Sequence, residues 1–225
     1  MSLLPSGALP YVAPYAMFLL LVELGARLPG AAPVLFPLRL VAPAALLAWF
    51  WRRGAYPELR GYRASAATFA DICAGLLIAA LWVGPYLLLP SLARGESFDP
   101  ALLGEAGRAL ALGLRLAGFA LVTPFVEELF VRSFLLRFAE VLERGDFREV
   151  AVARFAWRGF VVSVLWFTFS HATWEWSVAL PTGIAFNAWL YARRHLMACV
   201  IAHAVANAAI WALVVFAPTP LWEFL

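Results

Sequence analysis

Residues 66–89 read AATFADICAGLLIAALWVGPYLLL, and Asp71 is their only charged side chain. About 20 apolar residues in a helix cross the roughly 30 Å hydrocarbon core of a bilayer, so this stretch predicts a transmembrane span. The sequence therefore predicts an all-α polytopic membrane bundle of about seven spans, in a single integral membrane domain over residues 1–225. The other six apolar runs lie at 11–28, 34–51, 118–138, 159–174, 177–192 and 196–216.

The composition excludes most soluble classes of protein. Of the 225 residues, 64% are apolar and 14% charged, with a mean hydropathy of +0.83, whereas an average soluble domain is about half apolar and a quarter charged. A soluble globule, a disordered chain and a disulfide scaffold are therefore excluded. The sequence has no Gly-rich phosphate loop and no basic tract with interleaved aromatic residues, so the lipid bilayer is the expected partner and nucleic acid is not.

The basic residues predict the orientation of the spans. All 17 are arginine, and most follow the second, fourth and sixth runs, where positive charge marks the cytoplasmic side. This pattern predicts a multi-pass protein of the cell inner (plasma) membrane with a cytoplasmic N-terminus. The arginines of these loops are Arg52, Arg53, Arg60 and Arg63, then Arg137, Arg144, Arg148, Arg154 and Arg158, and finally Arg193 and Arg194.

Residues 101–117, ALLGEAGRALALGLRLA, are apolar enough to be a span but carry three charges. Glu105, Arg108 and Arg115 are three and seven residues apart, so they share one face of a helix. An amphipathic helix lying on the outer surface explains this stripe. An eighth span would instead put the Arg137–Arg158 loop outside, so we expect one interfacial amphipathic helix here.

Two acidic residues near span ends have a structural interpretation. Glu23 is four residues before Arg27, a spacing that favours an ion pair on one helix. Asp71 is close to the cytoplasmic arginines and is expected to pair with one of them. Both carboxylates are therefore expected to stabilise the bundle, because span ends tolerate charge better than span centres.

Three other titratable groups are predicted to lie at a common depth. Glu127, His171 and His203 are each nine to thirteen residues from an arginine of the cytoplasmic loops, which puts them roughly 14–20 Å from the inner surface if helical. Ionisable groups at the middle of a membrane are costly, so this agreement favours one functional site. Pro124, just before Glu127, is expected to interrupt the helical hydrogen bonds and open the backbone to a cavity.

The local spacings arrange these groups further. Glu128 and Arg132 are four residues apart and are expected to form an ion pair on one helix face. Glu127 then points about 100° away and is free to face another element. His203 and Asn207 are also four residues apart, so they present two hydrogen-bonding groups along one face.

These residue types suit the hydrolysis of a carbonyl compound by water. A carboxylate in a low-dielectric cavity is a useful general base for water. A histidine beside it orients the water, and a His–Asn pair donates hydrogen bonds to the oxyanion that forms. Ser170 adjoins His171, but helix neighbours point about 100° apart, so serine catalysis is not expected.

The pattern Glu127-Glu128-x-x-x-Arg132, Phe167-x-x-x-His171 and His203-x-x-x-Asn207 resembles the CPBP (Abi) family of intramembrane proteases. That family includes the type II CAAX prenyl endopeptidases. The resemblance implies a protease-like core over residues 118–216 and endopeptidase activity within the bilayer. It also implies the roles of the catalytic residues: Glu127 activates the water and His171 assists it, His203 and Asn207 form the oxyanion hole, and Glu128 and Arg132 support the site.

The cofactor stays open at this point. The sequence lacks the His-Glu-x-x-His spacing of common zinc proteases, although two histidines and a glutamate are also a sufficient set of zinc ligands. A metal-free glutamate mechanism is favoured.

Two other functions compete with the protease. The polar cluster could hold the helices of a non-catalytic membrane scaffold or partner-binding relative, or Glu127 could relay protons in a small transporter. Transport is disfavoured because the sequence shows no inverted repeat. A peptide or protein substrate would enter from the membrane or through a cytoplasmic mouth. The all-arginine, Ala- and Leu-rich composition indicates a bacterial source, which favours maturation of a peptide or surface protein.

Overall fold

The computed structural model describes residues 7–89, 91–92, 94–142, 145–217 and 221–225. Arg144 of the predicted cytoplasmic cluster lies outside these residues. Within the described residues all regular structure is helical, so the all-α prediction is confirmed. The principal helices are α1 (Leu9–Arg27), α2 (Ala32–Arg52), α3 (Ala66–Leu88), a long segment (Glu105–Val141), α7 (Trp157–Phe169), α8 (Trp176–Arg193) and α9 (Leu196–Phe216).

Each of these helices overlaps one of the seven predicted runs, and the polytopic membrane bundle is confirmed. Five are long and apolar enough to cross a membrane: α1, α2 with the preceding turn, α3, the long segment and α9. The other two, α7 with 13 residues and α8 with 18, are shorter or more polar and lie side by side. α3 begins at a side-chain cap, in which the hydroxyl of Ser65 accepts a hydrogen bond from the amide of Ala67 and the hydroxyl of Thr68 accepts one from the amide of Ser65, so its start is fixed by local sequence.

The predicted surface helix at 101–117 is wrong as a separate element. Residues 105–141 form one continuous helical segment of 37 residues, with no turn between residues 116 and 118. Nothing at this junction stops a helix, because Ala117 and Gly118 stay in the hydrogen-bonded ladder as the start of a π-helix. The parts of the segment are η3 (Glu105–Gly107), α4 (Arg108–Leu116), η4 (Ala117–Val122), α5 (Thr123–Glu127), η5 (Glu128–Leu135) and α6 (Leu136–Val141).

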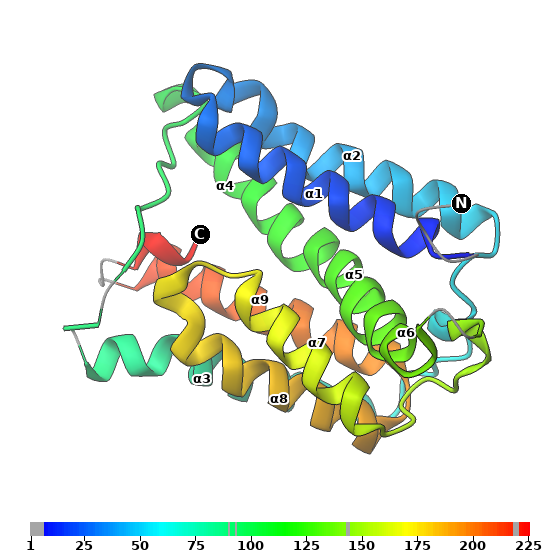
Figure 1. Cartoon of the computed structure of the whole chain (residues 1–225). Helices are drawn as coiled ribbons and strands as arrows, with labels where there is room; N and C mark the ends of the chain where they lie inside the picture. The colour runs from blue at the N-terminus through cyan, green and yellow to red at the C-terminus, as the bar shows by residue number, and fades with distance from the viewer. Residues whose placement is uncertain (1–6, 90, 93, 143–144, 218–220) are drawn as a thin grey trace.

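This long segment divides the molecule. Figure 1 shows it crossing the bundle diagonally, with the α1–α2 hairpin on one side and α3, α7, α8 and α9 on the other. α3 packs closely on α9, where a side chain on Gly75 would overlap the carbonyl oxygen of Ala202. Small residues at such contacts let membrane helices approach each other.

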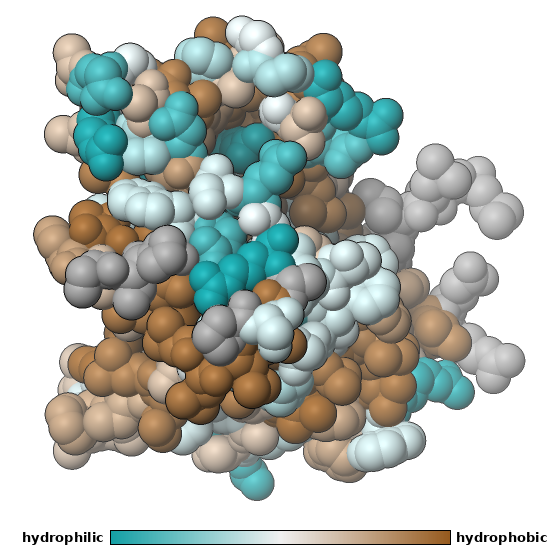
Figure 2. Space-filling view, turned by 90° about the vertical axis from the view of Figure 1, so that its left-hand side faces the viewer, coloured by the Kyte–Doolittle hydropathy of each residue, from teal (hydrophilic) through white to brown (hydrophobic). Residues whose placement is uncertain are grey.

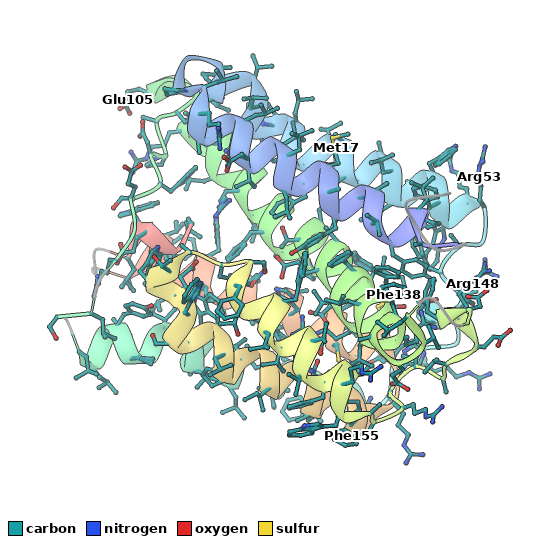
Figure 3. All side chains as sticks on the ribbon, viewed as in Figure 1. Met17, Arg53, Glu105, Phe138, Arg148 and Phe155 are labelled. Carbon is teal, nitrogen blue, oxygen red and sulfur yellow. The ribbon has the colours of Figure 1, made fainter. Side chains whose placement is uncertain are left out.

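The two ends of the bundle differ in charge. One end carries the arginine-rich loops between α2 and α3 and between α6 and α7; Arg53 and Arg148 mark it in Figure 3, and Glu105 marks the opposite end. That opposite end is built from the segment between α3 and the long helix, the turn between α7 and α8, and residues 221–225. We call these the arginine-rich end and the opposite end.

Candidate active site

A buried ionic cluster joins the long segment to α9. Glu128 and Arg132 are both 0% exposed, and Nη1 of Arg132 lies 3.3 Å from Oε1 of Glu128, so the predicted ion pair is present. Nδ1 of His203 lies 2.8 Å from the same carboxylate oxygen. The guanidinium of Arg132 lies over two rings, 4.5 Å from the centroid of Phe167 and 5.1 Å from that of Phe186. The cluster therefore fixes His203 against the long segment.

A cavity of about 60 Å³ lies beside this cluster. Four of the six residues predicted for the site line it: Glu127, His171, His203 and Asn207. The cavity is large enough for water, and Glu128 and Arg132 lie behind its wall. The rest of its lining is mainly aromatic and aliphatic, from Ile78, Trp82, Phe119, Thr123, Phe167, Thr182, Phe186, Ala206 and Ile210.

His171 is not inside a span, so that part of the prediction is wrong. α7 ends at Phe169, and His171 lies in the turn that follows. Nδ1 of His171 lies 2.6 Å from the carbonyl oxygen of Phe167, and Oγ of Ser170 bonds the same oxygen at 3.0 Å. Polar side chains that bond carbonyl oxygens in the last turn of a helix compete with its backbone hydrogen bonds. The side chains of Ser170 and His171 end α7 in this way. The imidazole reaches the cavity from the opposite end of the bundle.

The cavity opens into a larger one of about 400 Å³, which we call the vestibule. Glu127, His171, Trp82, Phe119 and Thr123 line both. Segments 95–96, 170–175 and 223–225 form the mouth of the vestibule at the opposite end. Figure 2 views this end and shows hydrophilic side chains gathered at the middle of the face and along its top. This location differs from the expected mouth on the arginine-rich side.

Pro124 separates two π-helical stretches, η4 and η5, as an interruption of the ladder predicts. In a π-type ladder the donor to the carbonyl of Phe119 would be residue 124, and proline has no N–H. That carbonyl oxygen instead accepts a hydrogen bond of 2.7 Å from Nδ2 of Asn207. The proline therefore frees the backbone acceptor that holds Asn207 at the cavity.

Residues 109–209 match the family model for type II CAAX prenyl endopeptidase Rce1-like proteins. This segment is similar to the Rce1-like family. It contains all three motifs, so the resemblance inferred from them is confirmed, and the family is one of membrane-embedded proteases. No curated protein and no solved structure matches the chain.

Neighbouring groups set the protonation of both histidines in the Rce1-like segment. Nδ1 of His171 faces a carbonyl oxygen, which only accepts, so Nδ1 carries the proton and Nε2 of the neutral ring is an acceptor. Nδ1 of His203 faces the carboxylate of Glu128 and is likewise the protonated atom. With Nδ1 as the donor to that carboxylate, Nε2 of His203 donates only when the ring carries a second proton.

Glu127 is half-buried and faces the cavity. No hydrogen bond or ion pair from the described residues reaches its carboxylate, so both oxygens are open to water or substrate. Glu175, at the vestibule, accepts a hydrogen bond of 3.1 Å from the backbone amide of Ala172. Its partial burial raises the pKa of this carboxyl.

The ligand set of the Rce1-like segment does not fit a three-ligand zinc site. Among the described residues, no three His, Cys, Asp or Glu side chains lie close enough together to hold a metal ion. Glu127, His171 and His203 share the cavity without converging on one point, and Nδ1 of each histidine is engaged by a protein acceptor.

The two acidic residues assigned to structure have the predicted partners. Oε1 of Glu23 lies 2.5 Å from Nε of Arg27. Asp71 is fully buried, with Oδ1 lying 2.7 Å from Nε of Arg193 and 3.0 Å from Nε1 of Trp189. Both predictions are confirmed, and neither residue lines the cavity.

Sequence reasoning missed most of the other residues that line the cavity, among them Thr123 and Trp82. Thr123 lines both the cavity and the vestibule, and its position four residues before Glu127 placed it on the same helical face. The ring of Trp82 packs edge-on against His171, with centroids 5.1 Å apart. No sequence signal pointed to Trp82, because α3 meets the site only through tertiary packing.

Proposed function

We propose that this protein is an intramembrane endopeptidase that hydrolyses a peptide bond with water activated by Glu127. The observation that carries the proposal is the cavity in which Glu127, His171, His203 and Asn207 meet and which opens into the vestibule. A general base without a fixed partner, a histidine acceptor and two oxyanion donors are the groups that this hydrolysis requires.

The reaction begins with water held between Glu127 and Nε2 of His171. Glu127 takes a proton as the water oxygen bonds to the peptide carbonyl carbon. The carbonyl oxygen becomes an oxyanion, which accepts hydrogen bonds from Nε2 of the His203 imidazolium and from the second N–H of the Asn207 amide. The proton on Glu127 then passes to the amide nitrogen as the C–N bond breaks, giving a carboxylic acid and an amine and restoring the carboxylate.

Glu128 and Arg132 act through His203. Both are buried behind the cavity wall, and neither lines the cavity. Glu128 holds the imidazole by Nδ1 and stabilises its positive charge, while Arg132 balances the buried carboxylate. They are positioning residues.

The proposal includes the side of the membrane on which the reaction occurs. Arginine-rich loops remain on the cytoplasmic side, and the vestibule opens at the other end of the bundle. The substrate would then reach the site after its cleaved segment has crossed the membrane. Maturation of an exported bacterial peptide or surface protein fits this arrangement.

Cysteine labelling tests this orientation. Gly145→Cys, in a background carrying Cys73→Ser and Cys199→Ala, should react with an impermeant maleimide only from the cytoplasmic side. Glu105→Cys in the same background should react in intact cells. Glu143, the neighbouring position, lies outside the described residues. The reverse labelling pattern would place the vestibule mouth in the cytoplasm.

Metal removal tests the chemistry. Protein purified into lipid nanodiscs and incubated with a mixture of apolar peptides should release fragments with new termini, detected by mass spectrometry. Because Glu127 activates the water directly, cleavage should persist in strong chelators, and metal analysis should find no stoichiometric ion. A metal bound one to one, and lost together with activity in His171→Ala and His203→Ala, would reject the glutamate mechanism.

A further inference from the structure

Two arginines line the vestibule on the side of the α1–α2 hairpin. Arg39 comes from α2 and Arg115 from α4, at the start of the long segment. Both also line a smaller cavity of about 40 Å³ that adjoins the vestibule. Among the described residues, these arginines are the only charged ones lining that cavity; its other lining residues are Phe18, Val22, Phe36, Leu40, Leu114, Gly118, Phe119 and Thr123.

The described part of the chain gives neither guanidinium a carboxylate partner. Arg39 donates only long hydrogen bonds, of 3.3 and 3.4 Å, to the carbonyl oxygens of Leu21 and Val22. Nε of Arg115 is buried without a hydrogen-bond partner, and its guanidinium lies 5.2 Å from the ring centroid of Phe119. Burying the Nε donor of Arg115 without an acceptor is costly, and Arg39, which is half-buried, has only its two long bonds to carbonyl oxygens.

Other arginines of the bundle differ in this respect. Arg94, Arg132, Arg137 and Arg193 pair with Glu223, Glu128, Glu58 and Asp71 respectively. Each of these four arginines thus has a carboxylate partner from the chain itself. Among the described arginines that are not exposed, the two vestibule arginines are the exception, which indicates that their carboxylate partner comes from a bound molecule.

The fold makes room for these groups. A side chain on Gly25 of α1 would overlap Nη2 of Arg39, so the glycine leaves space for the guanidinium. The cavity itself is large enough for a planar carboxylate, and two guanidinium groups suit such an anion. The carboxylates of Glu96, Glu175 and Glu223 line the vestibule but not the smaller cavity. An anionic group is therefore favoured only at the arginine side.

Resting on the proposed function, we propose that Arg39 and Arg115 bind a carboxylate of the peptide substrate and so fix its position relative to Glu127. The carboxylate is a free C-terminus or an acidic side chain. Arg115 precedes Glu127 by twelve residues, roughly 18 Å along a helix. An extended peptide covers this distance in about five residues. The arginines thus select peptides that carry a carboxylate several residues from the bond to be cleaved.

Peptide binding to the Glu127→Gln protein tests the site without turnover. The protein, in nanodiscs of neutral lipid, is titrated with fluorescent apolar pentapeptides in four forms. The first pair has no acidic side chain, and its members end in a free carboxylate and in an amide. The second pair ends in an amide, and its members carry one internal Glu and one internal Gln. At least one carboxylate form should bind roughly 10- to 100-fold more tightly than its neutral counterpart, the range expected for hydrogen bonds to a charged group. The pair that shows the difference identifies the source of the carboxylate.

The variants Arg39→Gln and Arg115→Gln should each abolish this difference. Arg27→Gln is the matched control, because Arg27 is at the same end of the bundle but is exposed and paired with Glu23. Gly25→Ala keeps both charges and displaces Arg39, so it should weaken carboxylate binding without any change in charge. Thermal midpoints of all variants establish that the protein is folded; removal of an unpaired guanidinium should not lower them.

Several results would overturn the proposal. The proposal is wrong if acidic and neutral peptides bind equally, or if no peptide binds. It is also wrong if the preference for the carboxylate survives in both arginine variants. A preference for nanodiscs of phosphatidylglycerol, lost in Arg115→Gln without any preference among the peptides, would identify a lipid phosphate instead. Carboxylate-dependent binding with no cleavage by the wild-type protein would reject the proposed protease and leave the binding site standing.

Discussion

Glu127→Gln should lower the rate of peptide cleavage by about 10²–10⁴-fold, the contribution of a single general base. Glutamine keeps the size and polarity of the side chain but cannot take a proton from water. No ion pair is broken, because the carboxylate has no partner among the described residues. The thermal midpoint should therefore stay at the wild-type value, measured by tryptophan fluorescence in nanodiscs alongside the peptide assay.

Glu23→Gln is the matched control for this substitution. Glu23 is also a glutamate on a long apolar helix, but it is exposed, pairs with Arg27 and does not line the cavity. Its activity should equal that of the wild type. A Glu127→Gln protein that still cleaves peptides, or that still matures its client in cells, would reject the protease and favour a non-catalytic scaffold.

Glu128→Gln should have a different effect, a loss of stability of about 3–5 kcal/mol, the range for removing one partner of a buried ion pair. The change leaves the Arg132 guanidinium charged and fully enclosed, with the rings of Phe167 and Phe186 as its remaining cation contacts. It also removes the acceptor of His203 Nδ1. Folded yield and thermal midpoint should fall together with activity.

A double variant separates the two roles of Glu128. Glu128→Gln with Arg132→Met removes both charges, so it should recover much of the stability that the single change loses. Activity should stay low, because His203 still lacks the carboxylate that stabilises its imidazolium. A double variant that regains activity with stability would show that Glu128 only balances Arg132. An unchanged thermal midpoint in Glu128→Gln would contradict the buried ion pair itself.

The individual side-chain contacts of the site that could be predicted are those within one helix. Glu128 and Arg132 are four residues apart, so the helical repeat alone placed their side chains together, and the structure has this pair. The contact of Glu128 with His203 joins residues 75 apart in the sequence. No spacing rule gives that contact, because the packing of α9 against the long segment creates it.

The ends of the helices were also only partly predictable from the sequence. The apolar character of 101–141 predicted two helices, since the charges of Glu105, Arg108 and Arg115 marked a surface stripe. The structure has one segment, in which Arg115 turns toward the vestibule. Hydropathy also extended the fifth span beyond Phe169, although the side chains of Ser170 and His171 contact the carbonyl oxygen of Phe167 in the last turn of α7. Side-chain hydrogen bonds thus ended α7, whereas the backbone ladder continued through residues 116–118 because nothing there interrupted it.

The sequence by itself determined that this protein belongs in a membrane, its all-helical architecture and four of the residues that line the cavity. Those properties depend on the apolar composition of each run and on the spacing of residues along a helix. Apolar runs enter the bilayer, and there the backbone must bond within the helix. The tertiary structure alone decided that the cavity opens away from the arginine-rich end and that Arg39 and Arg115 face it. Such features depend on which faces of distant helices pack together, and in a bilayer many faces are equally apolar, so shape and a few polar contacts make the choice.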